Sequence, residues 1–261
     1  MAQCKFYSLI TIVSVVAMLG ACASRAVTET AAPKFSGEEI AAALKEAEEL
    51  FAARRDRSKL RAAVETLKRV RDPDKRNFEV EWKFSKYIYF LSKQTDSEEE
   101  AENLLKEGMA AGLIASRIAP ERPDGHFWYG ANLGEQAKRS PVTIGLKSID
   151  DIRETMNKVI AIDPTYQGAS AFDALAQIEL QTGLFGGKAE KAVEYLQKAL
   201  EYEKNNAFVQ LHLAEAYLAV GKKAEAKKML EQLLQMKPAP GYEIEYEEAS
   251  AEAKKILEKR F

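Results

Sequence analysis

Apolar residues recur every three or four positions along almost the whole chain after Ser36. The segment that follows, EEIAAALKEAEELFAARR, places Ile40, Leu44 and Phe51 on one face of a helix. The stretch FEVEWKF alternates briefly, but WKFSKYIYFL continues it at helical spacing. Sustained alternation, which would indicate a β-strand, is absent from the sequence. The pattern therefore predicts an all-α protein.

The strongest internal pattern lies in residues 207–238, AFVQLHLAEAYLAVGKKAEAKKMLEQLLQMKP. The pattern has a large, a small and an aromatic residue before a glycine, and a small residue, a large residue and a proline after it. In order, these positions are Leu213, Ala214, Tyr217, Gly221, Ala226, Leu230 and Pro238. Small residues let two antiparallel helices approach closely, the glycine closes the turn, and the proline ends the second helix. This spacing resembles the tetratricopeptide repeat, whose helix pairs stack into a superhelix.

Earlier parts of the chain carry weaker versions of the same unit. The preceding unit, AFDALAQIELQTGLFGGKAEKAVEYLQKALE, keeps the order of small and large residues but has four extra residues in its turn. A more degenerate unit begins near Trp128 and ends at Pro164, and residues 78–118 and 38–71 form two more helix pairs. These units predict four or five helical pairs.

Residues 243–260, EIEYEEASAEAKKILEKR, predict a final charged helix. Such a helix suits the end of a solenoid, whose last face needs a polar exterior. We therefore predict one tetratricopeptide-type superhelix over residues 37–261, with degenerate N-terminal repeats and a C-terminal capping helix.

The first 21 residues have a different pattern. Lys5 precedes an apolar run that is shorter than the roughly 20 residues of a membrane span. The run ends in LGAC, and this sequence at Cys22 resembles a bacterial lipobox, in which the cysteine is lipidated and becomes the first residue after cleavage. We expect a signal peptide at 1–21 and a lipidated cysteine with a flexible tether at 22–36. The alternatives are an ordinary signal peptide cut beside Cys22, an uncleaved anchor helix, and a tether that packs on the fold.

The residue after the cysteine bears on localisation. Ala23 stands where an aspartate would usually retain a bacterial lipoprotein in the inner membrane. The resemblance therefore implies attachment to the periplasmic face of a bacterial membrane, with the outer membrane favoured. Lipid chains at Cys22 would hold the protein there, because each buried methylene contributes about 0.8 kcal/mol.

Composition narrows the class of function. Lys and Arg number 38 against 40 Asp and Glu, a net charge of −2, which lacks the basic excess of nucleic-acid-binding proteins. The cysteines are Cys4 and Cys22, so the mature domain has no disulfide. His126 and His212 are the two histidines, and neither has a carboxylate or cysteine at metal-ligand spacing. We expect no metal, no cofactor and no catalysis, because no nucleophile, base and orienting group can be assembled.

In tetratricopeptide repeats, the first helix of each pair lines the concave surface. This register predicts a partner or ligand groove on three successive helices, formed by His126, Tyr129, Leu133, Gln136, Asp173, Gln177, Phe208, Leu211 and Glu215. Trp128 and Asn132 add a pocket to it, although Trp128 filling the core is an alternative. The face mixes aromatic, amide and apolar groups, which suit a peptide, a protein surface or an amphiphile better than a reactive substrate.

The order of three segments carries a closer resemblance. FWYGANLGEQA, a helix ending in IDPTY, and LFGGKAEKAVEYLQKALE together resemble the TatT family, the tetratricopeptide T-component of some TRAP transporters. The resemblance implies a periplasmic lipoprotein that binds a TRAP solute-binding protein, forms a homotrimer and passes a hydrophobic small ligand toward that protein. The well-formed repeat at 207–238 departs from the family. It keeps open the alternative of a scaffold for cell-envelope or outer-membrane assembly.

Overall fold

The computed structural model describes residues 34–141, 145–183 and 186–261. These residues belong to one compact unit, Pro33–Phe261. The predicted signal peptide, Cys22 and the tether up to residue 33 lie outside the described residues. The lipobox therefore stays a prediction from the sequence.

The described residues form eleven α-helices and no β-strand, which confirms the all-α prediction. The helices are α1 (Gly37–Ala52), α2 (Arg57–Arg69), α3 (Phe78–Gln94), α4 (Glu98–Ile118), α5 (Pro123–Arg139), α6 (Leu146–Ile162), α7 (Tyr166–Gln181), α8 (Ala189–Tyr202), α9 (Ala207–Ala219), α10 (Lys223–Gln235) and α11 (Glu243–Arg260).

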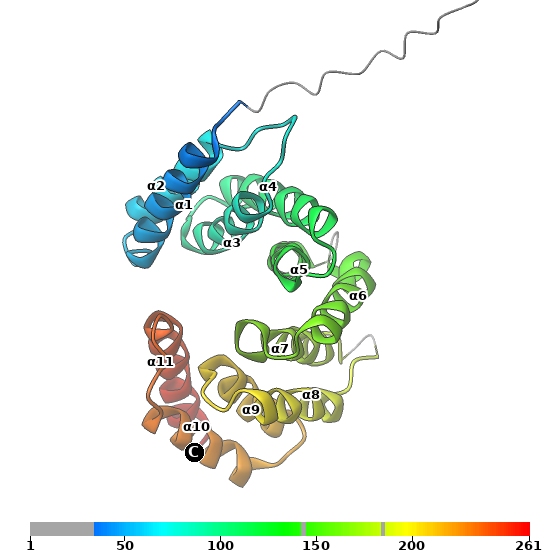
Figure 1. Ribbon diagram of the computed structural model, residues 1–261. Helices are drawn as coiled ribbons and strands as arrows, with labels where there is room; N and C mark the ends of the chain where they lie inside the picture. The colour runs from blue at the N-terminus through cyan, green and yellow to red at the C-terminus, as the bar shows by residue number, and fades with distance from the viewer. Residues whose placement is uncertain (1–33, 142–144, 184–185) are drawn as a thin grey trace, which may run out of the picture. The chain divides into compact units, whose positions relative to one another are not determined.

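Successive helices pair into five hairpins, and α11 follows the last of them (Figure 1). Each helix packs mainly against its neighbours in the sequence, as in a solenoid of repeats. Within the compact unit the hairpins follow a curved path, with α3, α5, α7 and α9 on its inner side (Figure 1). The prediction of a tetratricopeptide-type superhelix is confirmed.

Local sequence explains where the first helix begins. The Ser36 hydroxyl accepts a hydrogen bond from the Glu39 backbone N–H at 3.2 Å, and the Glu39 carboxylate accepts one from the Ser36 N–H at 2.7 Å. This reciprocal pair is a capping box, which satisfies two backbone donors that have no partner inside the helix. At the starts of α2, α3 and α4, the side chains of Asp56, Asn77 and Ser97 likewise accept a hydrogen bond from a backbone N–H of the first turn.

The C-terminal repeats are held by the apolar residues that define the repeat pattern. Ala214, Ala226 and Leu230 are fully buried where α9, α10 and α11 meet, and Leu213 packs against α7 and α8. Small residues at the crossing points let the helices approach closely, and the large residues fill the space beside them.

The N-terminal half uses a different contact between helices. The fully buried Asn132 amide on α5 donates hydrogen bonds to the Ser85 carbonyl and hydroxyl on α3, both at 3.1 Å, and to the Trp128 carbonyl at 2.7 Å. The Ser85 hydroxyl donates to the Gly108 carbonyl on α4 at 2.7 Å. A Cβ atom at Gly112 would lie 2.6 Å from the Tyr129 backbone nitrogen. Glycine is therefore required where α4 meets α5.

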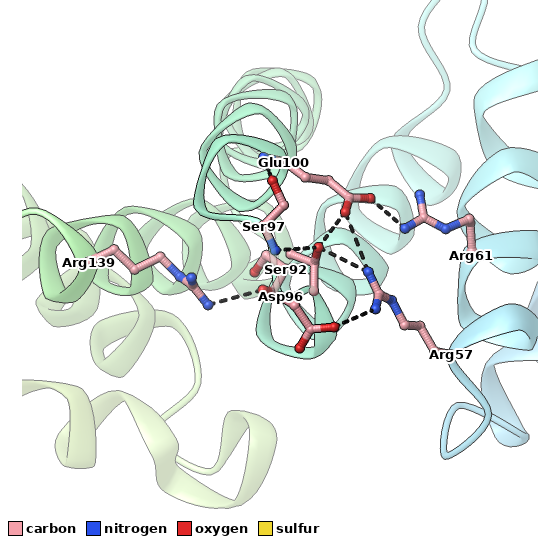
Figure 2. Close-up of polar contacts among 8 residues, drawn as sticks. Arg57, Arg61, Ser92, Asp96, Ser97, Glu100 and Arg139 are labelled. Atoms are coloured by element: carbon pink, nitrogen blue, oxygen red, sulfur yellow. Dashed lines mark hydrogen bonds and ion pairs between the residues drawn. The ribbon is translucent and has the colours of Figure 1, made fainter.

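A surface network ties the α3–α4 turn to its neighbours (Figure 2). Arg57 on α2 donates to the Thr95 hydroxyl at 3.0 Å and to the Glu100 carboxylate at 3.4 Å, and Arg61 also donates to Glu100. On the other side, Arg139 on α5 donates to the Ser92 carbonyl at 3.1 Å. The network fixes three successive hairpins at one edge.

Candidate functional site

A cavity of about 850 Å³ opens on the concave side of the helices. Its walls come from α3, α5, α6, α7 and α9, and from the beginning of α11. This volume falls within the range of cavities that hold small organic molecules. The cavity is therefore the strongest candidate for a binding site in the described residues.

One wall of the cavity is aromatic and aliphatic. Trp128 on α5 lies with its ring centroid 5.0 Å from that of Phe127 and 6.0 Å from that of Phe90 on α3. Helix α6 continues this wall with Ile149, Ile152 and Met156. Such a wall binds apolar groups by the hydrophobic effect and aromatic rings by edge and stacking contacts.

The opposite side carries an ion pair. His212 Nδ1 on α9 lies 2.7 Å from Asp173 Oδ1 on α7, and both residues line the cavity. Burial alone would lower the pKa of His212, but the charge of Asp173 and its hydrogen bond to the imidazole outweigh burial and raise it. Phe208, one turn away, stacks on the His212 ring at a centroid distance of 5.8 Å. The imidazole is therefore held in one orientation and favoured in its charged form.

Glu215 lies on the same helix as His212, one turn further along. Burial raises the pKa of its carboxyl, His212 opposes this rise, and the nearby Asp173 charge adds to it. The charge of Glu252 adds to the rise as well, and Lys138 opposes it together with His212.

The first hairpin and the last helix meet beside the cavity through charged groups. Arg54 Nη2 donates to the Gly241 carbonyl at 2.9 Å and to both Glu245 carboxylate oxygens at 3.0 Å. We call this set of contacts the clasp. The Arg54 guanidinium also lies over the Phe51 ring, with its central carbon 4.9 Å from the ring centroid. Arg54 is buried, so the contact is shielded from water.

The clasp has a weaker, exposed companion. Arg55 pairs with the Glu247 carboxylate at 2.6 Å, and both side chains are more than half exposed. Among the described residues, none of the buried apolar clusters joins α1 to α11. The closure between the ends of the superhelix is therefore polar.

A half-buried lysine lies beside the aromatic wall. The Lys86 ammonium lies 5.0 Å from the Phe51 ring centroid and 5.6 Å from that of Trp128. Burial, together with the positive charges of Arg54 and Lys83, lowers the pKa of Lys86 to about 8. The aromatic rings partly compensate for lost hydration through cation–π attraction.

Four of the residues predicted for the groove and pocket line the cavity: Trp128, Asp173, Gln177 and Phe208. On α7 and at the start of α9, the predicted register and the observed inner face agree. The Trp128 ring both borders the cavity and packs in a buried cluster, so the structure unites the two alternatives considered for it.

The other predicted residues are placed beside the cavity without lining it. On α5, His126 contacts the Pro120 carbonyl at 3.0 Å, and Tyr129 donates to Asp151 at 2.7 Å. The remaining ones lie in helix contacts or just behind the wall: Asn132, Leu133, Gln136, Leu211 and Glu215. Asn132 faces α3 and α4. The inner face of α5 is therefore formed by Phe127, Ala131 and Gly134 instead.

Several lining residues were not predicted from the sequence. The α6 residues Ile149 and Met156 lie in the degenerate unit between Trp128 and Pro164, for whose second helix no lining residue was predicted. Arg54, Ile244 and Glu245 come from opposite ends of the chain. Amphipathic spacing marks the α6 residues as buried, but no local signal indicates that residues 54 and 245 meet.

The described ranges contain no cluster of three or more histidine, cysteine, aspartate or glutamate side chains arranged to hold a metal ion. None of their helices is both long enough and apolar enough to span a membrane.

Two family models match different parts of the chain. Residues 43–170 match the family described as regulator of microtubule dynamics protein 1-3, and residues 186–243 match a tetratricopeptide repeat. No curated protein matches the chain significantly.

Solved structures of repeat proteins resemble the chain at low sequence identity. TTC0263, a thermophilic tetratricopeptide protein of Thermus thermophilus, is 17% identical, with a TM-score of 0.57 over 82% of this chain and 98% of its own. A structure of MamA is 17% identical, with a TM-score of 0.48 over 75% of this chain and 98% of its own. The first likeness shows a shared fold, and the chain is a repeat protein of the tetratricopeptide type.

Proposed function

We propose that the protein is a lipid-anchored periplasmic carrier that binds a solute-binding protein of a TRAP-type transporter and delivers a small ligand to it. The observation that carries the proposal is the cavity, whose mostly apolar lining lies on the concave face. Solenoid repeats use their concave surface for binding. The resemblance of FWYGANLGEQA and LFGGKAEKAVEYLQKALE to the TatT family supplies the partner, the location and the homotrimer.

The proposed lipid anchor rests on the LGAC segment, whose last residue is Cys22. A lipid on that cysteine would hold the domain at the membrane through the tether, with the outer membrane favoured by Ala23. Replacement of Cys22 by serine is expected to release the protein from the membrane fraction. Unchanged sedimentation with membranes would contradict the lipid anchor.

The partner is tested with the full-length tagged lipoprotein as bait after crosslinking in native cells. We expect a periplasmic solute-binding protein to be recovered. Recovery of envelope-assembly proteins alone would contradict the transporter role and favour the second candidate, a scaffold for cell-envelope assembly. That candidate is favoured by the tetratricopeptide match at residues 186–243.

The ligand cavity is tested separately by filling it. Gly134 lines the cavity, and a Cβ atom there meets nothing within 4 Å, so Gly134→Phe projects a ring into the open space. We expect this variant to stop enhancing the fluorescence of anilinonaphthalene sulfonate. Gly37→Phe is the matched control, because its Cβ is equally unobstructed and lies outside the cavity. Equal dye binding by both variants would contradict a cavity ligand.

A further inference from the structure

The inner face of α7 is divided lengthwise into a polar and an apolar stripe. Ser170, Asp173, Gln177 and Gln181 all line the cavity. Their spacing of three or four residues places them on one side of the helix. Ala174 and Ile178, also in the lining, form a parallel stripe beside them, with Ile178 in the buried cluster that contains Ile152 and Met156.

The two stripes face different neighbours. Asp173 reaches across to His212 on α9, which places the polar stripe toward α9. Ala174 and Ile178 pack with the α5 and α6 side chains, which places the apolar stripe toward the aromatic wall. On α7, the boundary between polar and apolar lining therefore runs along the helix, and Glu135 and Lys138 add charged groups at one end of α5.

The polar stripe spans most of the helix. From Ser170 to Gln181 the backbone rises by about 16 Å, at 1.5 Å per residue. A ligand that lies along the stripe with apolar atoms against it would remove water from these side chains over that length. This is unfavourable even for Ser170 and Asp173, whose side chains already bond to Gln167 and His212.

One group on the stripe lacks a partner of its own. The Gln177 amide oxygen accepts a hydrogen bond from the Gln181 side-chain nitrogen at 3.3 Å. The Gln177 side-chain nitrogen is buried and has no hydrogen-bond acceptor among the described residues. An acceptor oxygen on a bound molecule would satisfy this donor in the middle of the stripe.

From these contacts we infer that the cavity binds a facial amphiphile, a molecule with one apolar long face and hydrogen-bonding oxygens along the other. The inference rests on the proposed ligand-carrying function and specifies the ligand class. The apolar face contacts the wall formed by α5 and α6, and the oxygens contact the stripe on α7. Hydroxylated steroid-like molecules have this chemistry, whereas straight-chain acids carry their polar atoms at one end.

The experiment compares ligands that differ only in the polar edge. Titration calorimetry on the full-length protein measures the affinity for deoxycholate and for cholanate, the same steroid acid without hydroxyl groups, both below their micelle concentrations. We expect deoxycholate to bind about tenfold more tightly, which corresponds to about 1.4 kcal/mol. Gln177→Leu keeps a side chain of similar size and is expected to abolish the difference.

The matched control is Gln210→Leu, the same replacement of a partly buried glutamine in the groove between α8, α9 and α10, outside the cavity. It is expected to retain the preference for deoxycholate. Equal affinities for the two steroids in the unaltered protein, or a preference that persists in Gln177→Leu, would overturn the inference.

Laurate, a straight-chain acid, separates this inference from the proposed function. If laurate binds and neither steroid does, the cavity carries a ligand with one polar head, and the facial class is refuted while the carrier function stands. If neither the steroids nor laurate nor the fluorescent dye binds, the cavity carries no such ligand, and both are refuted.

Discussion

The two halves of the superhelix bring helices together by different means. Around α3, α4 and α5, the contact depends on Gly112 and on the Asn132 amide, which reaches across to Ser85. Around α9, α10 and α11, it depends on buried alanines and leucines such as Ala214 and Leu230. Both solutions give close packing, but the second matches the repeat pattern and the first does not. Similar helix pairs can therefore arise from side chains that a consensus pattern does not include.

The glycine contact gives the largest expected effect. Gly112→Ala would place a Cβ against the α5 backbone at Tyr129, and neither helix can move without disturbing the Asn132 contacts. We expect a loss of about 3 kcal/mol in the free energy of unfolding, measured by urea denaturation. Gly134→Ala is the control, because its Cβ meets no atom, and a gain of about 0.5 kcal/mol is expected there. A similar loss in both variants would show that close approach is not the cause.

The amide contact gives the next effect. Asn132→Ala leaves the Ser85 and Trp128 carbonyls without their side-chain donor in a site that water does not reach. We expect a loss of about 2 kcal/mol by the same measurement. If Asn132→Leu restores stability to that of the unaltered protein, packing volume matters more here than hydrogen bonding.

The C-terminal half is tested by overpacking. Ala214→Val adds two methyl groups at a fully buried crossing of α9 with α10 and α11. We expect a loss of about 1 kcal/mol, smaller than at Gly112 because the neighbours are side chains that can adjust. Ala219→Val, at an exposed position on the same helix, should cost less. A larger loss at Ala214 than at Gly112 would reverse the comparison.

The smallest effect concerns pH. The raised pKa of His212 in the folded state means that the imidazolium adds stability below its unfolded pKa of about 6.5. That stability is lost as the pH rises through the raised value. We expect the melting temperature to fall by about 2 °C across this window. Asp173→Asn removes the main stabilising charge and should flatten the dependence, and a slope that persists in this variant would assign it to another group.

The sequence predicted the parts of the molecule that depend on local periodicity. Helical spacing in EEIAAALKEAEELFAARR and the small and large residues of 207–238 predicted the helices and the superhelix. The cavity-lining positions followed on α7, where the repeat register holds. On α5 the same register placed His126 and Leu133 inward, whereas the contact of Asn132 with two helices rotates the inner face to other residues.

Contacts between distant parts of the chain were beyond such reasoning. Arg54 and Glu245 are separated by 191 positions, and each alone looks like an ordinary surface charge on a helical protein. Periodicity indicates which face of a helix is buried, but it carries no information on which residues meet when a curved stack of hairpins brings its two ends together. The clasp could be found only once the curvature was known.

The clasp changes how the repeats cooperate. A solenoid with free ends behaves as a linear array, in which the terminal units fray first and a local defect destabilises only the adjacent units. Joining Arg54 to Glu245 makes the array circular, so the first hairpin gains the last helix as a neighbour. Fraying at either end must then break a shielded charge contact as well as its own packing. Unfolding of this protein should accordingly behave more like that of a globular domain than like the stepwise melting of an open stack.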